Sequence, residues 1–192
     1  MVAAVAALLG ACGNGQPGPT AHPATVVKAA PDLTLATRTA HVATAAPGVT
    51  ATGRVVFASG RDVLTLAPPT VADPPFGVRE PAAVLDMLRG VTRVRSYGGA
   101  EVQGIGTKRY EVDIDVAKAI AATPEQRRAD LHLLDGKLGQ DKALWADVFV
   151  DAQGRVRRVL LPVETAMIRP YGQDQREPAL VSVDYSDFGK GA

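Results

Sequence analysis

The clearest strand pattern in the chain lies in the stretch GIGTKRYEVDID, residues 104–115. Successive residues of a β-strand point to opposite faces of a sheet, and apolar and charged side chains alternate along this stretch. The apolar set consists of Tyr110, Val112 and Ile114, and the charged set of Arg109, Glu111, Asp113 and Asp115. The pattern predicts a strand with one buried and one solvated face, and Gly104-Ile105-Gly106 predicts a hairpin turn to residues 101–103.

Strand patterns and turn residues continue on both sides of this hairpin. They predict a sheet whose neighbouring strands are joined by short turns, and such a sheet is antiparallel. Two short helices are expected, one over residues 81–89 with Val84, Leu85 and Leu88 on one face, and one from Thr123 to Gly139. The other predicted strands are residues 49–57, 63–67, 91–97, 144–150, 155–163, 167–171 and 179–188.

This inventory predicts an α+β fold built on a strongly curved antiparallel sheet. One face of such a sheet meets water, and the apolar face has to be covered by another layer. Two short helices are few for a sheet of seven or eight strands, so they either complete a solid core or cover a cavity.

The N-terminal stretch LLGAC, residues 8–12, has the pattern of a bacterial lipobox, and Cys12 is the one cysteine of the chain. We expect a signal peptidase to cut before Cys12 and the thiol to carry diacylglycerol, so that acyl chains such as palmitate anchor the protein. Residues 1–11 are apolar or small, but a bilayer span needs about 20 residues. No Lys or Arg precedes Cys12, so we infer that the natural start lies upstream. The alternative is an Ala-rich N-terminus with an inert thiol.

Three parts of the chain follow from this interpretation. Residues 1–11 are the lipoprotein signal peptide, residues 12–31 the lipid anchor and a disordered tether, and residues 32–192 one folded domain. The tether is predicted from its many Gly and Pro residues, which interrupt regular structure. The protein is expected at the extracytoplasmic face of the cell membrane, held there through Cys12.

Charge and composition argue against several function classes. The net charge is +1, from 21 basic and 20 acidic residues, so nothing indicates a nucleic-acid partner. His22, His41 and His132 are far apart and there is no second cysteine, so we predict no metal site and no cofactor. No serine lies in a Gly-x-Ser-x-Gly motif, and we expect no catalytic residues and no enzyme.

Three groups of polar or aromatic residues allow two interpretations each. Asp113 and Asp115 could form a carboxylate pair, but strand alternation favours a solvated face. Arg155, Arg157 and Arg158 are either a solvent face near a sheet edge or a contact for anionic lipid headgroups. The third group lies on one strand face and either lines a pocket rim or packs: Trp145, Asp147 and Phe149.

Four stretches together resemble a known family. They are REPAAVLDMLRG at 79–90, GIGTKRYEVDID at 104–115, DVFVDAQGRVRRV at 147–159 and VDYSDFG at 183–189. Their order is similar to that of actinobacterial LolA-like lipoproteins, related to the mycobacterial LppX/LprG lipoprotein family. The resemblance implies an incomplete antiparallel β-barrel whose concave apolar face is covered by helices, and several members carry acylated lipids or lipid-linked proteins across the envelope.

The functional hypothesis is a monomeric envelope lipoprotein that binds or carries a lipid acyl chain between the curved sheet and a helical lid. The alternative is a structural or regulatory interaction lipoprotein with a solid core, which presents its outer face or the loop 68–75 to a partner. The residues expected to line a hydrophobic pocket are Leu88, Tyr110, Val112, Ile114, Val181 and Val183.

Overall fold

The computed structural model describes residues 21–58, 61–138, 143–163 and 179–190. Its eight strands form one antiparallel sheet in the order β3-β2-β1-β8-β7-β6-β5-β4. The predicted signal peptide, Cys12 and the predicted strand 167–171 lie outside the described residues. The strands are β1 Thr39–Ala46, β2 Val49–Val56, β3 Arg61–Ala67, β4 Val91–Val102, β5 Ile105–Asp115, β6 Ala143–Asp151, β7 Val156–Pro162 and β8 Leu180–Ser186.

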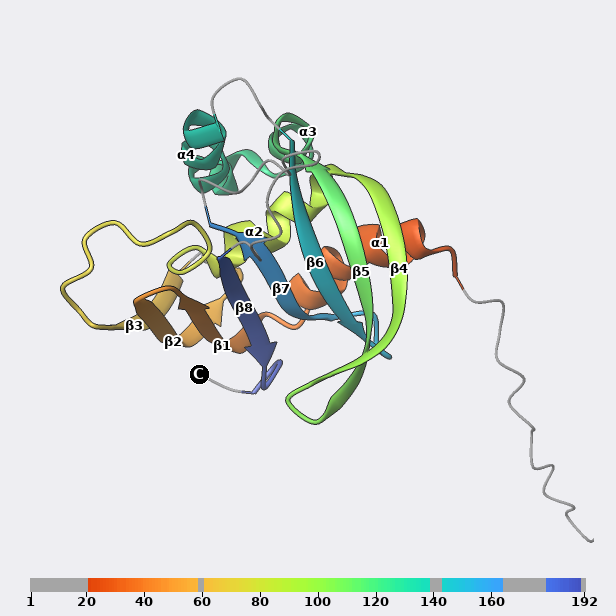
Figure 1. Ribbon diagram of the computed structural model, residues 1–192, viewed down its shortest axis with the longest axis horizontal. Helices are drawn as coiled ribbons and strands as arrows, with labels where there is room; N and C mark the ends of the chain where they lie inside the picture. Colours follow the sequence, from red (N-terminus) through yellow and green to blue (C-terminus); the bar gives the residue numbers. More distant parts are fainter. Residues whose placement is uncertain (1–20, 59–60, 139–142, 164–178, 191–192) are drawn as a thin grey trace, which may run out of the picture.

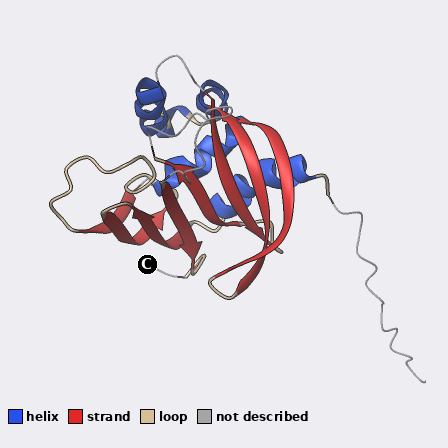
Figure 2. Cartoon of the chain, viewed as in Figure 1, coloured by secondary structure: helices blue, strands red, loops and turns tan. Residues whose placement is uncertain are grey.

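The predicted α+β class and the strongly curved, unclosed sheet are confirmed. The sheet bends along β4 to β7, and its edge strands β3 and β4 lie at opposite ends of the strand order (Figure 1). Helices α1 and α2 lie against the concave face of the sheet, and α3 and α4 lie near the ends of β5 and β6 (Figure 1 and Figure 2). The described helices are α1 Pro23–Leu35, α2 Pro81–Met87, the 3₁₀ turn η1 Leu88–Gly90, α3 Val116–Ala122, the 3₁₀ turn η2 Glu125–Arg127 and α4 Ala129–Leu138.

The β4–β5 hairpin is confirmed, but its turn lies one residue earlier than predicted. Val102 pairs with Ile105, so the two turn residues are Gln103 and Gly104, with φ of 51° and 77°. Two-residue turns of this kind need a positive φ at both positions, which matches the right-handed twist of the flanking strands. Ile105 and Gly106 are therefore the first residues of β5, not part of the turn.

The prediction of a disordered tether through residue 31 is wrong for residues 23–31, which form most of α1. His22 caps this helix, because its ring nitrogen accepts a hydrogen bond from the Ala24 N–H, and Pro23 occupies the first turn, where a missing N–H costs nothing. Val27 and Ala30 are fully buried against the sheet. Tertiary burial of this face decides the conformation, which an argument from Gly and Pro content does not register.

A buried threonine fixes α1 to the sheet. The Thr34 hydroxyl donates to Ala30 O at 2.7 Å and accepts from the Val156 N–H at 2.9 Å. This contact joins residues 122 positions apart and satisfies the first amide of β7. The segment 33–45, whose secondary structure the sequence left open, contains the end of α1 and most of β1.

The helical region between β5 and β6 differs from its prediction. The predicted helix start at Thr123 is wrong: Thr123 caps the C-terminus of α3, a helix that the sequence did not indicate, and α4 begins at Ala129. The Thr123 hydroxyl donates to Ala119 O at 2.8 Å, so it acts at the end of a helix instead of the start. Leu131 and Leu134 of α4 are fully buried, and Leu138 is partly buried and packs against the same core.

Candidate functional site

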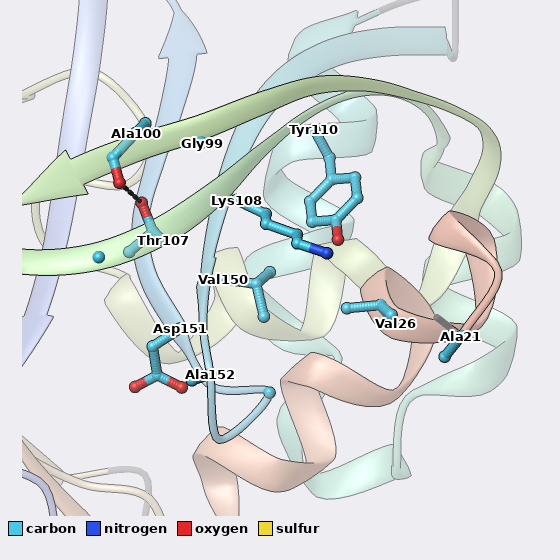
Figure 3. Close-up of a pocket in the computed structure, with 12 residues that line it drawn as sticks. Ala21, Val26, Gly99, Ala100, Thr107, Lys108, Tyr110, Val150, Asp151 and Ala152 are labelled. Atoms are coloured by element: carbon cyan, nitrogen blue, oxygen red, sulfur yellow. Dashed lines mark hydrogen bonds between the residues drawn. The ribbon is translucent and has the colours of Figure 1, made fainter. Parts of the chain in front are cut away.

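A pocket of about 550 Å³ lies between the N-terminal end of α1, the turn-side ends of β4, β5 and β6, and the β6–β7 turn (Figure 3). Most of its wall comes from small or apolar residues, and four lining side chains carry polar groups: Thr107, Lys108, Tyr110 and Asp151. The remaining lining residues are Ala21, Val26, Gly99, Ala100, Gly106, Val150, Ala152 and Gly154.

The pocket exists because side chains on the inner face of the sheet become small toward the β4–β5 turn. Lys108 of β5 is flanked by Gly99 of β4 and by Val150 of β6. A Cβ atom built on Gly99 or on Gly106 would meet nothing within 4 Å. Neither residue has a positive φ, so no backbone conformation requires glycine there. The two glycines leave unfilled space beside Val26 of α1.

Tyr110 closes the pocket toward the core. Its side chain is 3% exposed, and burial raises the pKa of its phenol, so the hydroxyl stays protonated at neutral pH. The hydroxyl makes no hydrogen bond with any group in the described part of the chain. The hydroxyl oxygen is not one of the fully buried polar atoms without a partner, so it is accessible from the pocket and can donate to a ligand.

Lys108 lies two residues before Tyr110 on the same face of β5, and it is exposed. Within the described ranges no carboxylate pairs with its ammonium group. In Figure 3 the polar ends of Lys108 and Tyr110 point to the same part of the pocket, near Val26 and Val150. Two hydrogen-bond donors, one of them charged, therefore converge in an otherwise apolar pocket.

Asp151 is the acidic residue of the pocket wall, and its charge is compensated by Arg155 and Arg157. Burial alone would raise the pKa of Asp151, but hydrogen bonds from Arg155 and Arg157 outweigh burial and hold the pKa below its ordinary range. One carboxylate oxygen accepts from Arg157 Nε at 2.8 Å and Arg155 Nη2 at 2.9 Å, and the other from the Gln153 and Arg155 amides. Asp151 is therefore part of the turn structure.

These contacts also bear on the two interpretations of the arginine cluster Arg155, Arg157 and Arg158. Arg155 and Arg157 both lie over the ring of Phe188, at 4.7 and 4.6 Å, while binding Asp151. Arg158 binds both carboxylate oxygens of Asp184, at 2.5 and 2.6 Å. All three guanidinium groups have carboxylate partners in the fold, which argues against a headgroup contact. The prediction of a solvent face near a sheet edge is wrong as well, because β7 lies between β6 and β8 inside the strand order.

The carboxylates on the outer face of β5 and β6 also have partners. Asp113 forms an exposed ion pair with Arg93 at 3.7 Å, and Asp115 caps α3 by accepting from the Lys118 N–H at 3.0 Å. Asp147 accepts from Arg109 at 2.8 Å. The predicted solvated face is confirmed for Asp113, and no acid–base pair is formed by Asp113 and Asp115.

One of the six predicted pocket residues, Tyr110, lines this pocket. The five others lie in the hydrophobic core at 0–1% exposure and do not line it: Leu88, Val112, Ile114, Val181 and Val183. Gly99, Gly106 and Lys108 line the pocket and were not predicted to do so. Lys108 could have been found, because alternation from Tyr110 places it on the inner face; the glycines become lining residues only once the register is known.

A second pocket of about 210 Å³ lies beside α4 and is more acidic. It is lined by Glu80, Asp73, Asp130 and Lys137 together with apolar residues. Burial raises the pKa of Glu80, although its carboxylate accepts the Gly77 N–H at 3.1 Å. Lys137 pairs with Asp73 at 3.6 Å, so the cation that faces these acids already has a partner.

Two further properties concern the described part of the chain alone. It holds no group of three or more His, Cys, Asp or Glu residues placed to bind a metal ion. Among its helices, none combines the length and apolarity needed to cross a membrane.

Comparison with solved structures finds similar mycobacterial proteins, LppX and LprF among them. The Mycobacterium tuberculosis lipoprotein LppX has 15% sequence identity and a TM-score of 0.47, over 88% of this chain and 97% of its own. LprF from Mycobacterium bovis has 11% identity and a TM-score of 0.47, over 88% of this chain and 94% of its own. LppX belongs to the group that the sequence resembles. No protein-family model and no curated protein matches the chain.

Proposed function

We propose that this protein is an envelope lipoprotein that binds an acyl chain in the pocket between α1 and the β4–β6 region. The observation that carries the proposal is the pocket itself: about 550 Å³, walled by valine, alanine and glycine, and bordered by two unpaired donors. Pockets of this size and character are typical of small-molecule sites. Transfer of acyl methylenes from water into such a pocket is favourable, at about 0.8 kcal/mol for each buried CH₂.

The position of the pocket suits a lipoprotein. Ala21 lines it and follows Cys12 by nine residues. At about 3.3 Å per extended residue, that segment spans at most about 30 Å. A diacylated Cys12 would therefore hold the pocket close to the membrane surface, where lipids enter and leave. Lipidation at Cys12 and a location at the extracytoplasmic face are parts of this proposal.

The alternative, an interaction lipoprotein with a solid core, is favoured by a different observation. Most of the concave face is filled: Leu88, Ile114 and Val183 are fully buried within one continuous hydrophobic cluster. Under this alternative the 550 Å³ pocket is a shallow surface feature with no ligand. The two proposals differ in whether purified protein contains lipid.

Native mass spectrometry tests the proposal. The full chain carrying Cys12→Ser would be produced in an actinobacterial host, analysed in the native state, and extracted with organic solvent for lipid analysis. We expect one lipid per chain. A mass without adduct, and no uptake of added fatty acid or phospholipid, would contradict the proposal and favour the interaction protein.

A matched pair of glycine variants locates the bound lipid. Gly106→Leu places a side chain in the pocket, and Gly136→Leu places the same side chain on α4, where a Cβ atom also meets nothing within 4 Å. Loading should fall in Gly106→Leu and stay at the wild-type level in Gly136→Leu. Equal loading in both variants would show that the lipid lies elsewhere.

A further inference from the structure

The polar side chains of the pocket wall that have no partner indicate which chemical group of a ligand would bind there. Of the four polar side chains in its wall, two are already engaged: the Thr107 hydroxyl donates to Ala100 O at 3.1 Å, and Asp151 binds Arg155 and Arg157. Lys108 and Tyr110 remain, and neither has a partner among the residues that the structure describes. The Lys108 ammonium can only donate hydrogen bonds, and the protonated Tyr110 hydroxyl supplies one more donor.

We propose that the pocket recognises the carboxylate of a fatty acid, which Lys108 Nζ pairs with and the Tyr110 hydroxyl hydrogen-bonds. This inference rests on the proposed function and adds the chemical class of the ligand. An acceptor-only, negatively charged group is the complement of two donors of which one is a cation.

The apolar part of the pocket is consistent with this head position. Val26 and Val150 lie beside the two donors, and the small residues Gly99, Ala100 and Gly106 line the adjacent wall (Figure 3). A single chain attached to the carboxylate would lie along these residues. Asp151 does not repel such a ligand strongly, because two arginines at 2.8 and 2.9 Å compensate its charge.

If the ligand head is a carboxylate, the pocket should bind a fatty acid more tightly than a neutral ester with the same acyl chain. The probes are parinaric acid, a fluorescent fatty acid, and its methyl ester, titrated into the full chain carrying Cys12→Ser. The acid should bind at least about tenfold more tightly, the factor that a charge-assisted hydrogen bond typically contributes. Lys108→Met should lower acid affinity about tenfold and change ester affinity much less, and Lys108→Arg should retain the preference.

Two control variants separate recognition from folding. Tyr110→Phe should weaken acid binding several-fold while the Tm stays within a few degrees of wild type, because its hydroxyl has no described partner to lose. Lys118→Met removes a lysine that pairs with Asp115 at 3.4 Å and does not line the pocket, so both affinities should be unchanged.

The outcomes distinguish this inference from the function on which it rests. If acid and ester bind equally well to the wild type, or Lys108→Met weakens both equally, the carboxylate assignment is wrong and acyl-chain binding stands. If neither probe binds, acyl-chain binding and the carboxylate assignment are both overturned.

Discussion

The inner faces of β4, β5 and β6 differ sharply between their two ends. At the end beneath η1 and α3, Ile114 is flanked by Val91 and Leu144, and all three are buried. At the end near the N-terminus of α1, Lys108 is flanked by Gly99 and Val150, and the pocket lies there. The pairing of β5 with β6 runs without a shift between the two ends, whereas β4 shifts its register on β5 at Val91/Arg93 and at Ser96/Gly98. With these shifts in place, the difference in side-chain size makes one end solid and the other hollow.

This contrast separates two roles along a few strands. The packed end stabilises the fold, because filled inner-face positions remove apolar surface from water. The hollow end contributes little side-chain packing, since a Cβ atom built on Gly99 or on Gly106 would meet nothing within 4 Å. Substitutions at the packed end should therefore change stability, and substitutions at the pocket end should change ligand binding.

The largest loss of stability is expected on substitution of Leu88, which is fully buried between the helices and the sheet. Leu88→Ala should lower the free energy of unfolding by about 2–5 kcal/mol, because it removes buried methyl groups and leaves a cavity. Urea unfolding followed by circular dichroism measures this loss. A change below about 1 kcal/mol would show that the packed end is not close-packed.

The next effect is expected at Asp151, the charged residue that organises the pocket-end turn. Asp151→Asn weakens its bonds to Arg155 and Arg157 and should cost about 2–3 kcal/mol at neutral pH, the value of hydrogen bonds to charged groups. The pKa of Asp151 in the folded protein is below its ordinary value of 3.8. Its ionised form therefore stabilises the fold above pH 3.8, and this contribution is lost as the pH falls through the folded-state pKa. Unfolding measured from neutral to acidic pH should show wild type and variant converging; a constant difference would contradict the assignment.

The third prediction compares the stability cost of alanine substitutions at Gly90 and Gly99. A Cβ atom on Gly90, at the packed end, would lie 2.2 Å from Asp115 O and 2.8 Å from Ala119 N, whereas one on Gly99 meets nothing. Gly90→Ala should cost about 1–3 kcal/mol through overpacking. Gly99→Ala should change the unfolding free energy by less than about 0.5 kcal/mol. Thermal unfolding of the two variants side by side checks this, and similar Tm values would remove the distinction between the two ends.

A small loss of stability is expected on substitution of Asp86, a buried carboxylate of α2 at the packed end. Burial raises its pKa, although Arg127 and Arg89 oppose the increase. A raised folded-state pKa means that stability falls as the pH rises from 3.8 through that pKa, the opposite sign to Asp151. Asp86→Asn should therefore cost less than Asp151→Asn, about 1 kcal/mol, and should remove this decline. A steeper decline in the variant would show that the assigned direction is wrong.

The strands could be predicted from the sequence because their signals are local. Alternation in β5 and β8, and turn residues such as Gly154 with φ of 78°, fix strands and hairpins with little help from the rest of the fold. The helices α1 and α3 could not be predicted, because their conformation depends on burial against distant strands, as the bond from Val156 to Thr34 shows.

The pocket was harder to predict than the sheet. Apolar residues such as Val112 and Val183 were expected to line it, but large apolar side chains at facing positions fill the interior they point into. A pocket needs positions where side chains are missing, and Gly99 is such a position only because it lies beside Lys108. That pairing depends on the irregular register between Ser96 and Gly98, which no sequence pattern revealed.

The most direct test of the central claim is photo-crosslinking with a fatty acid that carries a diazirine near its carboxyl group. After irradiation of the full chain carrying Cys12→Ser, peptide mapping by mass spectrometry locates the labelled residues. The account predicts labels on residues 99–110 of the β4–β5 hairpin and on residues 150–154 at the β6–β7 turn, with loss of both in Gly106→Leu. Labels confined to the loop 68–75 or to the outer face of the sheet, or unchanged labelling in Gly106→Leu, would contradict it.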